Sequence, residues 1–454
     1  MGKRAVIIGG DAAGMSAAAQ LRRSAPQVEV VVFEKSAFAS YGACGMPYYI
    51  AGDIQSHHEL LALTPEQIEA RGIEVRYEHE VLDIHPGARL VAGRCRQGRA
   101  FREHYDLLLL ATGGTAVRPP WAEAHLDGVF TLRSLEDGIA LRRFLEARRP
   151  RRAVVIGSGF IGLEMVEALA RRGMEVALVG RSPHILGQFD SAFAAPVFDA
   201  LRHCGVQLHL SNSVHALTEV GGRVASVQTD AGELPADLVL LATGLVPGNQ
   251  LARTAGLALG ASGALAVDER MATNRSGIWA AGDCIEVKHV VSGEKVHKPL
   301  ALTANRTGRI AGEQMAAAAL GRLSAQRFRG TAGTMITKVL DYALAHTGLS
   351  LEEAQQAGFN AVVFERESRT RARYYPGSKP LKIRIVVERR TRRLLGAQLI
   401  GEEGVVGRID ALATALFARM TIDEVHQLDL AYAPPFGPVY DAIIDVCGKA
   451  ALEL

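Results

Sequence analysis

Cysteine is scarce in this sequence, and its distribution excludes two kinds of site. The 454 residues include five cysteines, an odd number, and no two of them form a CxxC motif or a pair with metal-ligand spacing. A disulfide framework and structural zinc are therefore not expected. The 14 histidines lack metal-ligand spacing as well, so no metal site is predicted. The cysteines are Cys44, Cys95, Cys204, Cys284 and Cys447.

Long apolar runs and a large excess of one charge are absent, and aromatic residues are few. No segment reaches the ~18 continuous apolar residues of a membrane span. Lys3-Arg4 leads straight into an apolar stretch with no secretion signal, so we expect a cytoplasmic protein that does not enter membranes. The net charge of +3 argues against general nucleic-acid binding, and 6% aromatic residues do not suit an all-β sandwich.

Glycine is abundant, with 47 residues, and it marks a pattern that occurs twice. The apolar run 5–8 is typical of a parallel strand buried on both faces. It leads into a glycine turn at 9–14, a helix over 15–24 and a strand over 28–34. The same order returns as a strand at 153–156, a glycine turn at 157–162, a helix over 163–172 and a strand at 175–179.

Each repeat closes with the same signature. Leu107–Leu110 runs into Ala111-Thr112-Gly113, and 238–241 runs into Ala242-Thr243-Gly244. The first repeat is longer by about 17 residues, which we place at 39–54. A further short strand at 278–281 ends in Gly282-Asp283 and could return to the first repeat.

The pattern changes after about residue 323, which predicts a third, α+β domain. Strands are expected over 331–346 and 358–365, and a helix over 407–420. An antiparallel pair is expected within 372–400, with Ile383, Ile385 and Val387 at alternate positions. The predicted fold is thus α/β, with two tandem Rossmann-like dinucleotide-binding domains and a C-terminal α+β dimerisation domain.

The glycine turns predict dinucleotide binding. In Gly157-x-Gly159-x-x-Gly162 the first glycine permits the tight turn, the second admits a pyrophosphate, and the third allows close helix–strand packing. In the first turn Asp11 replaces the second glycine, but Glu34 ends the next strand and is placed for an adenosine ribose.

Two dinucleotide modules, one with an added Gly-Asp element, indicate FAD together with NADPH or NADH. Asp283 would then hold a ribityl hydroxyl of the flavin. We assign residues 1–115 and 246–325 to an FAD-binding domain, 116–245 to an NAD(P)H-binding domain, and 326–454 to an interface domain.

Preference between the nicotinamide cofactors is decided at the end of the strand 175–179. Gly180 stands where an acid would accept hydrogen bonds from the ribose 2′-OH, and Arg181 follows. A guanidinium without that acid favours the 2′-phosphate of NADPH. If Arg181 is only solvated, either cofactor can serve.

Cys44 is the cysteine with a candidate redox role. It lies in Ser40-Tyr41-Gly42-Ala43-Cys44-Gly45-Met46-Pro47-Tyr48-Tyr49. A helix beginning just after it would lower the thiol pKa and favour the thiolate. No second cysteine lies within five residues, so its oxidised form must be a mixed disulfide, a sulfenic acid or a persulfide. From the residues alone, an inert core cysteine is the alternative.

Taken together, these motifs resemble the pyridine nucleotide-disulfide oxidoreductases over the whole chain. The Cys-Gly-x-Pro-Tyr-Tyr segment is most similar to the single-cysteine branch, and within it to coenzyme A-disulfide reductases. The resemblance implies an FAD-dependent NAD(P)H oxidoreductase that reduces a low-molecular-weight disulfide, most of all coenzyme A disulfide, through a mixed disulfide with Cys44. It also implies a homodimer with composite active sites. NAD(P)H oxidases and persulfide or polysulfide reductases are relatives and remain alternatives, as does an electron-transfer flavoprotein in which Cys44 is inert.

The resemblance also assigns roles to individual residues. For FAD it implies Gly9, Gly10, Ala13, Gly14, Glu34, Lys35, Ala111, Thr112, Gly113, Gly282 and Asp283. For NAD(P)H it implies Gly157, Gly159, Phe160, Gly162, Glu164, Arg181 and Gly244, with Phe160 as an aromatic gate over the flavin. For coenzyme A, as substrate or bound ligand, it implies Ser16, Gln20, Arg23, Ser40 and Asn305. Tyr432 and Tyr375 resemble phenols that reach the partner subunit's sulfur.

Some positions depart from the family pattern. Ala43 lacks an amide often found before the cysteine, and Gly72 lacks a basic side chain, although Arg71 is adjacent. The first glycine turn offers Asp11 where peroxidases carry a histidine, which argues against dedicated peroxide reduction. A basic strip in the third domain could bind substrate phosphates or form a solvated or intersubunit face. It comprises Arg366, Arg369, Arg371, Arg373, Lys379, Lys382 and Arg384.

Overall fold

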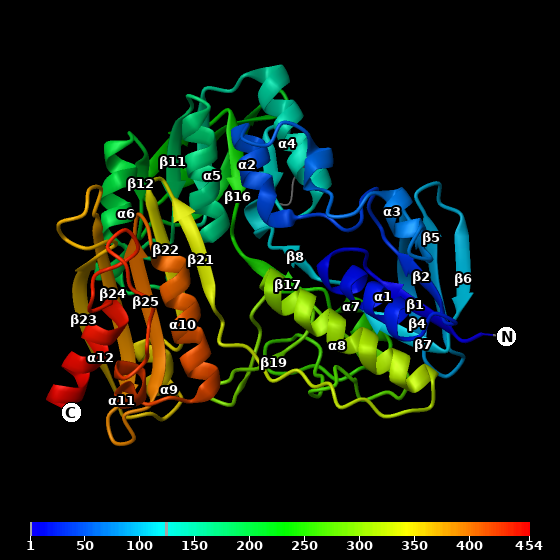
Figure 1. Cartoon of the computed structure of the whole chain (residues 1–454). Coiled ribbons are helices and arrows are strands. Elements are labelled where there is room, and N and C mark those ends of the chain that lie inside the picture. The colour runs from blue at the N-terminus through cyan, green and yellow to red at the C-terminus, as the bar shows by residue number, and fades with distance from the viewer. Residues whose placement is uncertain (1, 123–125) are drawn as a thin grey trace.

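The described residues form three five-stranded sheets, and the first of them is parallel (Figure 1). Four of its strands come from residues 4–110, and the fifth comes from 278–280. The computed structural model describes residues 2–122 and 126–454; residue 1 and residues 123–125, within the predicted ranges 1–115 and 116–245, lie outside it. The strand order is β18-β7-β1-β2-β3. The strands are β1 Arg4–Ile8, β2 Glu29–Phe33, β3 Ile73–Arg76, β7 Leu107–Leu110 and β18 Ile278–Ala280.

The second sheet repeats this order. It runs β12-β11-β10-β16-β9, again all parallel. Its strands are β9 Val129–Thr131, β10 Arg152–Ile156, β11 Glu175–Val179, β12 Gln207–His209 and β16 Leu238–Leu241. The duplication inferred from the motifs is therefore a duplication of architecture. The expected return of 278–281 is also confirmed, since β18 pairs with β7.

In each of these two sheets, a glycine turn connects one strand, β1 or β10, to the helix that follows it. Helix α1 spans Ala12–Ser24 and α5 spans Phe160–Arg171. Gly9 and Gly157 both have positive φ angles, 107° and 118°. A Cβ atom on Gly9 would collide with the carbonyl of Ala111, and one on Gly157 with that of Ala242. The glycine turn and the Ala-Thr-Gly segment therefore depend on each other through close backbone packing.

The extra residues of the first repeat cross over to the second. They contain the 3-10 turn η1 Ala43–Gly45 and helix α2 Met46–Ala51. Helix α2 packs against α5 and against α4 Leu135–Arg148, so a segment that begins in the first module lies on the second (Figure 1). This crossover places Cys44 between the two modules.

The third sheet is antiparallel, with the order β21-β22-β25-β24-β23. Its strands are β21 Met335–Val339, β22 Tyr342–Gly348, β23 Ala361–Arg369, β24 Pro380–Glu388 and β25 Leu394–Gly401. The single strand expected over 331–346 is wrong, because a turn at 340–341 splits it into the hairpin β21–β22. The residues 372–379 belong to a loop instead of the expected antiparallel pair.

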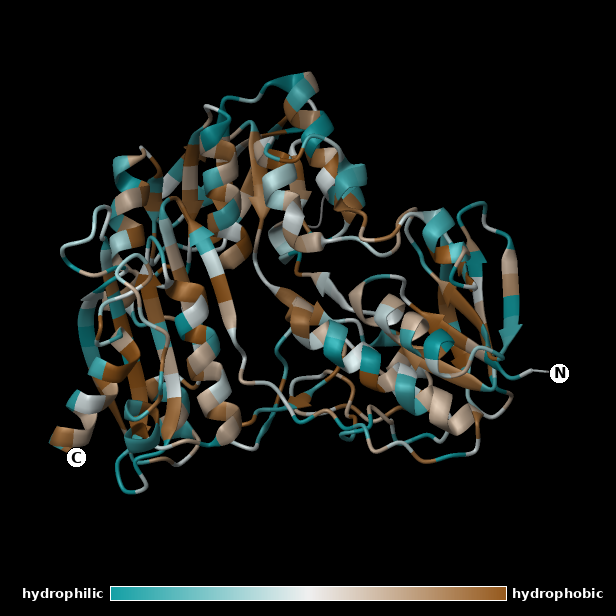
Figure 2. Ribbon diagram, viewed as in Figure 1, coloured by the Kyte–Doolittle hydropathy of each residue, from teal (hydrophilic) through white to brown (hydrophobic). Residues whose placement is uncertain are grey.

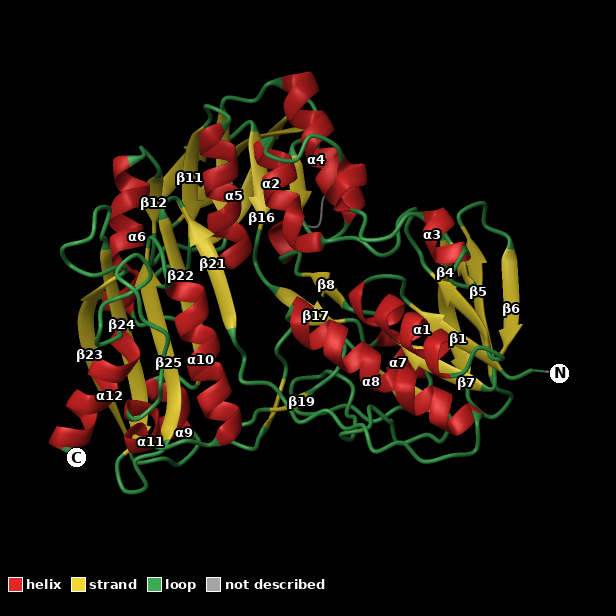
Figure 3. Ribbon diagram, in the orientation of Figure 1, coloured by secondary structure: helices red, strands yellow, loops and turns green. Residues whose placement is uncertain are grey.

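Alternation along β24 divides the two faces of this sheet. Ile383, Ile385 and Val387 are fully buried under α10 Val405–Ala418 and α12 Ala442–Glu453 (Figure 3). Lys382 and Arg384 point to the other face, where both contact the Phe193 ring of α6 Ser191–His203. The third domain thus docks on the second module through the polar side of its sheet.

Smaller elements complete the fold. The remaining strands are β4 His79–His85, β5 Leu90–Cys95, β6 Ala100–His104, β8 Gly114–Ala116, β13 Val214–Val220, β14 Arg223–Thr229, β15 Gly232–Pro235, β17 Leu245–Pro247, β19 Val287–Lys288 and β20 Lys295–Val296. The remaining helices are η2 His57–Leu60, α3 Pro65–Glu69, η3 Pro120–Ala122, α7 Gln250–Thr254, α8 Ala301–Ala319, α9 Leu351–Gln356 and α11 Ile422–His426.

Apolar residues concentrate in the strands of the three sheets and on the inner faces of their helices (Figure 2). Helix α8 lies along α1, and Gly308 and Gly312 allow close contact because a Cβ at either would strike the α1 backbone. None of the helices in the described part of the chain is long and apolar enough to cross a membrane.

Candidate active site

The first glycine turn is closed by Glu34 at the end of β2. The Glu34 carboxylate accepts hydrogen bonds from the Gly10 N–H (2.7 Å) and the Ser36 N–H (2.8 Å). Ala13 and Gly14 lie buried at the start of α1, and Lys35 is exposed beside the turn. Within the described residues, the buried Oδ1 of Asp11 has no hydrogen-bond partner, and burial raises the pKa of Asp11 to about 6.

The Gly-Asp element faces the same turn. The Gly282 N–H donates to Thr307 Oγ1 (3.1 Å), and a Cβ on Gly282 would press against Ala13. Asp283 pairs with Arg133 (3.0 Å), a residue the sequence did not single out because it belongs to no motif. Thr112, in the Ala111–Gly113 segment, bonds the Gly248 carbonyl (2.6 Å).

These residues fit a dinucleotide. The turn presents backbone N–H groups at the N-terminus of α1, its glycines allow the close backbone packing that forms it, and Glu34 and Asp283 lie beside it. Glu34 follows β2 and Asp283 comes soon after β18, and these two strands are far apart in the sequence. Both strands belong to one parallel sheet, so their carboxyl ends lie at the same edge.

The second turn is more open. A Cβ on Gly159 would meet nothing within 4 Å, so the turn has free space for a ligand. Phe160 is the first residue of α5 and its ring contacts Phe189 edge-on at 6.3 Å. Glu164 lies one turn further along α5 and accepts a hydrogen bond from Thr337 Oγ1 of the third domain (2.9 Å). Gly244 follows β16 at the same edge of the sheet.

The position expected to select the nicotinamide cofactor holds a small residue, Gly180, and the basic Arg181 follows it, as the sequence indicated. Gly180 lies directly after β11, and a Cβ there would approach Ser158 Oγ at 3.0 Å. Arg181 is exposed next to it. A larger residue at position 180 would therefore press on the side chains of Ser158 and Leu210, whereas the exposed side chain of Arg181 can be altered without that contact.

Cys44 does not have the environment that the sequence suggested. Its thiol is exposed, on η1 directly before α2, but its pKa is raised and not lowered. Surrounding protein desolvates the thiolate, and the carboxylates of Glu164, Asp11 and Asp283 oppose its charge more than Arg133 favours it. The expectation of a thiolate stabilised by the helix N-terminus is therefore wrong for these protein groups, because burial desolvates the thiolate and the charges of three acids add to that effect.

Four of the five residues implied for coenzyme A lie together. Ser16, Gln20 and Arg23 recur every three to four residues on α1, which places them on one face. Asn305 of α8 donates to Ser16 Oγ (2.8 Å), and Arg23 donates to Gln20 Oε1 (2.8 Å). We call this set the α1/α8 strip. Ser40 lies apart from it, buried beside the first glycine turn, where its N–H donates to the Gly10 carbonyl.

The α1/α8 strip borders a cavity of about 450 Å³. Arg306 sits in this cavity between the rings of Phe328 (4.8 Å) and Phe417 (5.7 Å). Among the described residues, Arg306 and Arg309 form no ion pair. The cavity is therefore a basic one, which the sequence motifs did not reveal. It is lined by Gln20, Arg306, Arg309, Ile310, Glu313, Gln326, Arg327 and Phe328.

The two tyrosines expected to reach a partner subunit, Tyr432 and Tyr375, lie in loops of the third domain. Tyr432 forms a hydroxyl–hydroxyl bond with Tyr374 (3.3 Å), and both rings are exposed. Tyr375 is half-buried, and its N–H closes a turn onto the Ala372 carbonyl. Tyr374 was not among the predicted residues, and the predicted reach of Tyr375 and Tyr432 to a partner subunit's sulfur stays a prediction.

Most cations of the basic strip are neutralised within the chain. Arg384 pairs with Asp190 (2.5 Å) and with Glu365, and Lys382 also reaches Glu365 (3.2 Å). Arg366, Arg371 and Lys379 pair with Asp445, Glu403 and Glu402. These contacts favour a structural role for the strip over a phosphate site.

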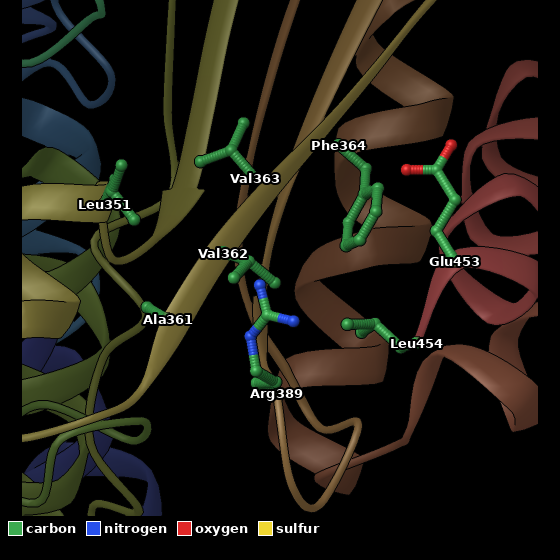
Figure 4. A pocket seen from close by; sticks show the side chains of 8 residues that line it. All are labelled: Leu351, Ala361, Val362, Val363, Phe364, Arg389, Glu453 and Leu454. Carbon is green, nitrogen blue, oxygen red and sulfur yellow. The ribbon is translucent and has the colours of Figure 1, made fainter.

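A second cavity, of about 430 Å³, lies at the edge of the third domain (Figure 4). Apolar side chains of β23 and the C-terminal Leu454 surround Arg389 there. It contains none of the predicted site residues. In the part of the chain that the structure describes, no cluster of three or more His, Cys, Asp or Glu side chains is arranged to hold a metal.

Comparison with known proteins agrees with this geometry. Residues 3–308 match the pyridine nucleotide-disulphide oxidoreductases, and 334–442 match the dimerisation domain of the same family. The chain belongs to this family. It is an oxidoreductase of a family that uses FAD and NAD(P)H, and it carries the family's dimerisation domain.

Individual relatives share most of the chain. An NAD(P)H sulfur oxidoreductase (CoA-dependent) of Pyrococcus abyssi is 39% identical and covers 97% of both chains. A coenzyme A disulfide reductase of Staphylococcus epidermidis is 32% identical, covering 96% of this chain and 97% of that one. The structure of an NAD-dependent persulfide reductase from A. fulgidus superposes with a TM-score of 0.94 at 35% identity, covering 99% of this chain and 83% of that one.

Proposed function

We propose that this protein is an FAD-dependent NAD(P)H oxidoreductase that reduces coenzyme A disulfide through Cys44. The observation that carries the proposal is the α1/α8 strip, which connects the neighbourhood of Cys44 with the basic cavity. Asp11, whose charge acts on the Cys44 thiol, stands at the N-terminus of α1, and Arg23 stands near its C-terminus. At 1.5 Å per residue the separation is about 18 Å.

That separation suits a substrate with a thiol at one end and phosphates at the other. Coenzyme A has this form, with an uncharged, amide-containing arm between its ends. Asn305 and Gln20 offer amide groups along the way, and Arg23 offers a cation at the far end. Arg306 and Arg309 offer further cations in the cavity that Gln20 borders. The coenzyme A-dependent relatives support the same substrate.

The cofactors belong to separate modules in this proposal. FAD is assigned to residues 1–115 and 246–325, held at the first glycine turn by Gly9, Gly10, Gly14, Glu34 and Asp283. NAD(P)H is assigned to residues 116–245, at the Gly157–Gly162 turn. When bound, FAD accepts a hydride from NAD(P)H and supplies two electrons to sulfur.

The residues of this chain then carry out the reaction at sulfur. Cys44 is exposed and can attack one sulfur of a disulfide, forming a mixed disulfide and releasing a thiolate. Phe160 would shield the flavin until the nicotinamide enters, and Glu164, fixed by Thr337, lies one turn further along α5. Arg181 selects NADPH through its 2′-phosphate.

A homodimer with composite sites completes the proposal. Tyr374, Tyr432 and Phe436 expose large aromatic surfaces, with 75%, 44% and 78% of the residue accessible. Such a cluster suits a subunit interface. In the dimer, Tyr432 would reach the sulfur at the partner's site.

A persulfide or polysulfide is the second candidate substrate. The lone, exposed Cys44 supports it, because one thiolate can attack a persulfide as readily as a disulfide. The sulfur and persulfide reductases among the relatives support it too. Oxygen reduction finds less support, since the first turn carries Asp11 and no histidine.

Replacement of Cys44 by serine tests the proposal. Cys44→Ser should reduce coenzyme A disulfide and persulfide turnover to the uncatalysed rate. The same variant should keep diaphorase activity toward artificial acceptors, because that reaction bypasses the cysteine. Cys204→Ser is the matched control, since Cys204 is likewise exposed but lies on the second module. Full disulfide reductase activity in Cys44→Ser would refute the mechanism.

A further inference from the structure

Helix α2 exposes one face, and Cys44 and Tyr48 share it. The backbone is helical from η1 through α2, since Gly45 and Met46 both have right-handed helical angles. Cys44 is exposed, and Tyr48 is 41% exposed. The other side chains of this segment pack inward: Met46, Pro47, Tyr49 and Ile50 are buried.

Helical geometry brings the phenol towards the thiol. Residues four apart lie one above the other on a helix, with Cβ atoms about 5–6 Å apart. Long side chains on a helix lean toward its N-terminus, so the ring of Tyr48 covers the turn that contains Cys44. Within the described residues, the Tyr48 hydroxyl forms no hydrogen bond, and it is free to donate one.

The orientation of this face is fixed by three arginines of the second module. Arg142 donates to the Tyr49 carbonyl, and Arg172 donates to the Ile50 carbonyl (2.5 Å). Arg171 holds Asp53 with two bonds of 2.7 and 2.6 Å. We call these residues the arginine clamp. These arginines bind the C-terminal end of α2 and hold it against α4 and α5.

Carboxylates surround both groups on this face. Burial is the largest cause that raises the pKa of the Tyr48 phenol, and the carboxylate of Glu164, held by Thr337, is the next. The same carboxylate also raises the pKa of the Cys44 thiol. Tyr48 therefore stays protonated and acts as a donor. The charged groups facing Cys44 are Glu164, Asp11, Asp283 and Arg133, and those facing Tyr48 are Glu164, Glu167, Asp53 and Cys44 itself.

We propose that Tyr48 is a catalytic residue whose hydroxyl donates a hydrogen bond to sulfur at Cys44. The inference rests on the proposed role of Cys44 and adds a residue that no motif assigned. Three acids oppose the Cys44 thiolate, and a donor one helical turn away offsets them. The phenol of the same subunit thus acts from the helix that carries the thiol.

The step is an exchange that needs no outside oxidant. The Cys44 thiolate attacks one sulfur of a disulfide RS–SR, the S–S bond breaks, a Cys44–S–SR bond forms, and RS⁻ departs. The Tyr48 O–H stabilises negative sulfur before attack, and its proton remains on oxygen throughout. The departing thiolate takes its proton from solvent.

Tyr48→Phe tests the inference, with Tyr49→Phe as the matched control. Tyr49 is the adjacent residue on the same helix, but it is buried, and its ring contacts Arg142. The measurement is the rate of Cys44 alkylation by iodoacetamide against pH in the FAD-loaded enzyme. Loss of one hydrogen bond to a charged group should raise the alkylation midpoint by about one pH unit and slow coenzyme A disulfide turnover about tenfold.

The outcomes separate this inference from the proposed function. Tyr48→His, which keeps a donor, should recover part of the midpoint shift. An unchanged midpoint in Tyr48→Phe, with Cys44→Ser inactive, overturns the role of Tyr48 and leaves that of Cys44 standing. If Cys44→Ser retains disulfide turnover, the proposed function itself fails. A similar shift in Tyr49→Phe would mean a general disturbance of α2 and would also overturn the inference.

Discussion

At the scale of single residues, the side chains that carry chemistry are held by neighbours that no motif names. Glu34 is fixed by backbone N–H groups, Asp283 by Arg133, and Glu164 by Thr337. Arg133 and Thr337 lie 150 and 173 residues from the acids that they hold, whereas Glu34 is held by Gly10 and by the nearby Ser36. A pattern of spacings can locate the acid, but the charge and the hydrogen bond that set its behaviour come from elsewhere in the chain.

Arg181 provides a prediction at this scale. Arg181→Ala should lower kcat/KM for NADPH about tenfold and leave that for NADH nearly unchanged, because only NADPH carries the 2′-phosphate that a guanidinium binds. Steady-state kinetics with both cofactors measures the ratio. This variant is cleaner than Gly180→Glu, whose Cβ would press on Ser158.

Arg151→Ala serves as the control for this experiment, since Arg151 is also an exposed arginine of the second module. It should leave the cofactor ratio as in the unchanged enzyme. An NADPH/NADH ratio that does not move in Arg181→Ala would show that Arg181 is only solvated.

At the scale of elements, the unexpected feature is the placement of α2. Its residues belong to the first repeat, yet its packing partners α4 and α5 belong to the second. Two arginines of the clamp donate hydrogen bonds to backbone carbonyls at the C-terminal end of α2, where the helix itself provides no donors. The helix dipole also favours cations at this end. The segment that carries the thiol is therefore anchored to the second module.

Loosening the clamp should affect sulfur chemistry selectively. Arg172→Ala removes a bond to the Ile50 carbonyl and should lower kcat/KM for coenzyme A disulfide about tenfold, with diaphorase activity within about twofold. Both activities can be measured on one preparation. Arg148→Ala, which removes only a surface pair with Asp127, should change neither. Equal loss of both activities in Arg172→Ala would contradict positioning by the clamp.

Secondary structure was predictable where periodicity and turn residues agreed. The central parallel strands and helices α1, α5 and α10 were found within a few residues, because buried apolar runs and glycine turns specify them. The outer parallel strands β3, β9 and β12 were not predicted. The hairpin β21–β22 was missed, since its turn at Leu340-Asp341 contains neither glycine nor proline. Leu340 adopts a φ of 54°, which only the pairing of the two strands makes favourable.

At the scale of the whole molecule, the third domain is joined to the rest by buried polar contacts. His346 of β22 is buried, and its pKa falls to about 4 because burial opposes its charge. It lies among Glu353, Lys298 and His289, which come from both sides of the junction. Asp190 and Arg384 join the second module to the same domain.

His346 makes stability depend on pH. Between its ordinary pKa of 6.5 and about 4, the unfolded chain binds the proton more strongly, so the folded state should weaken as pH falls through this range. The loss is on the order of 2 kcal/mol from pH 7 to pH 5. Urea unfolding at several pH values measures it, and His346→Gln should unfold with less dependence on pH. The same slope in the variant would assign the effect to other groups.

The sequence by itself determined the two nucleotide modules, the family and which of the five cysteines is the candidate redox residue. These features depend on local constraints: glycine where the backbone must turn or touch, apolar runs where strands are buried, and one thiol without a local partner. Tertiary structure alone decided that three acids raise the pKa of Cys44, that Tyr374 and not Tyr375 meets Tyr432, and that a basic cavity adjoins the α1/α8 strip. Electrostatic and packing interactions act through space, between residues whose separation along the chain carries no signal of their contact.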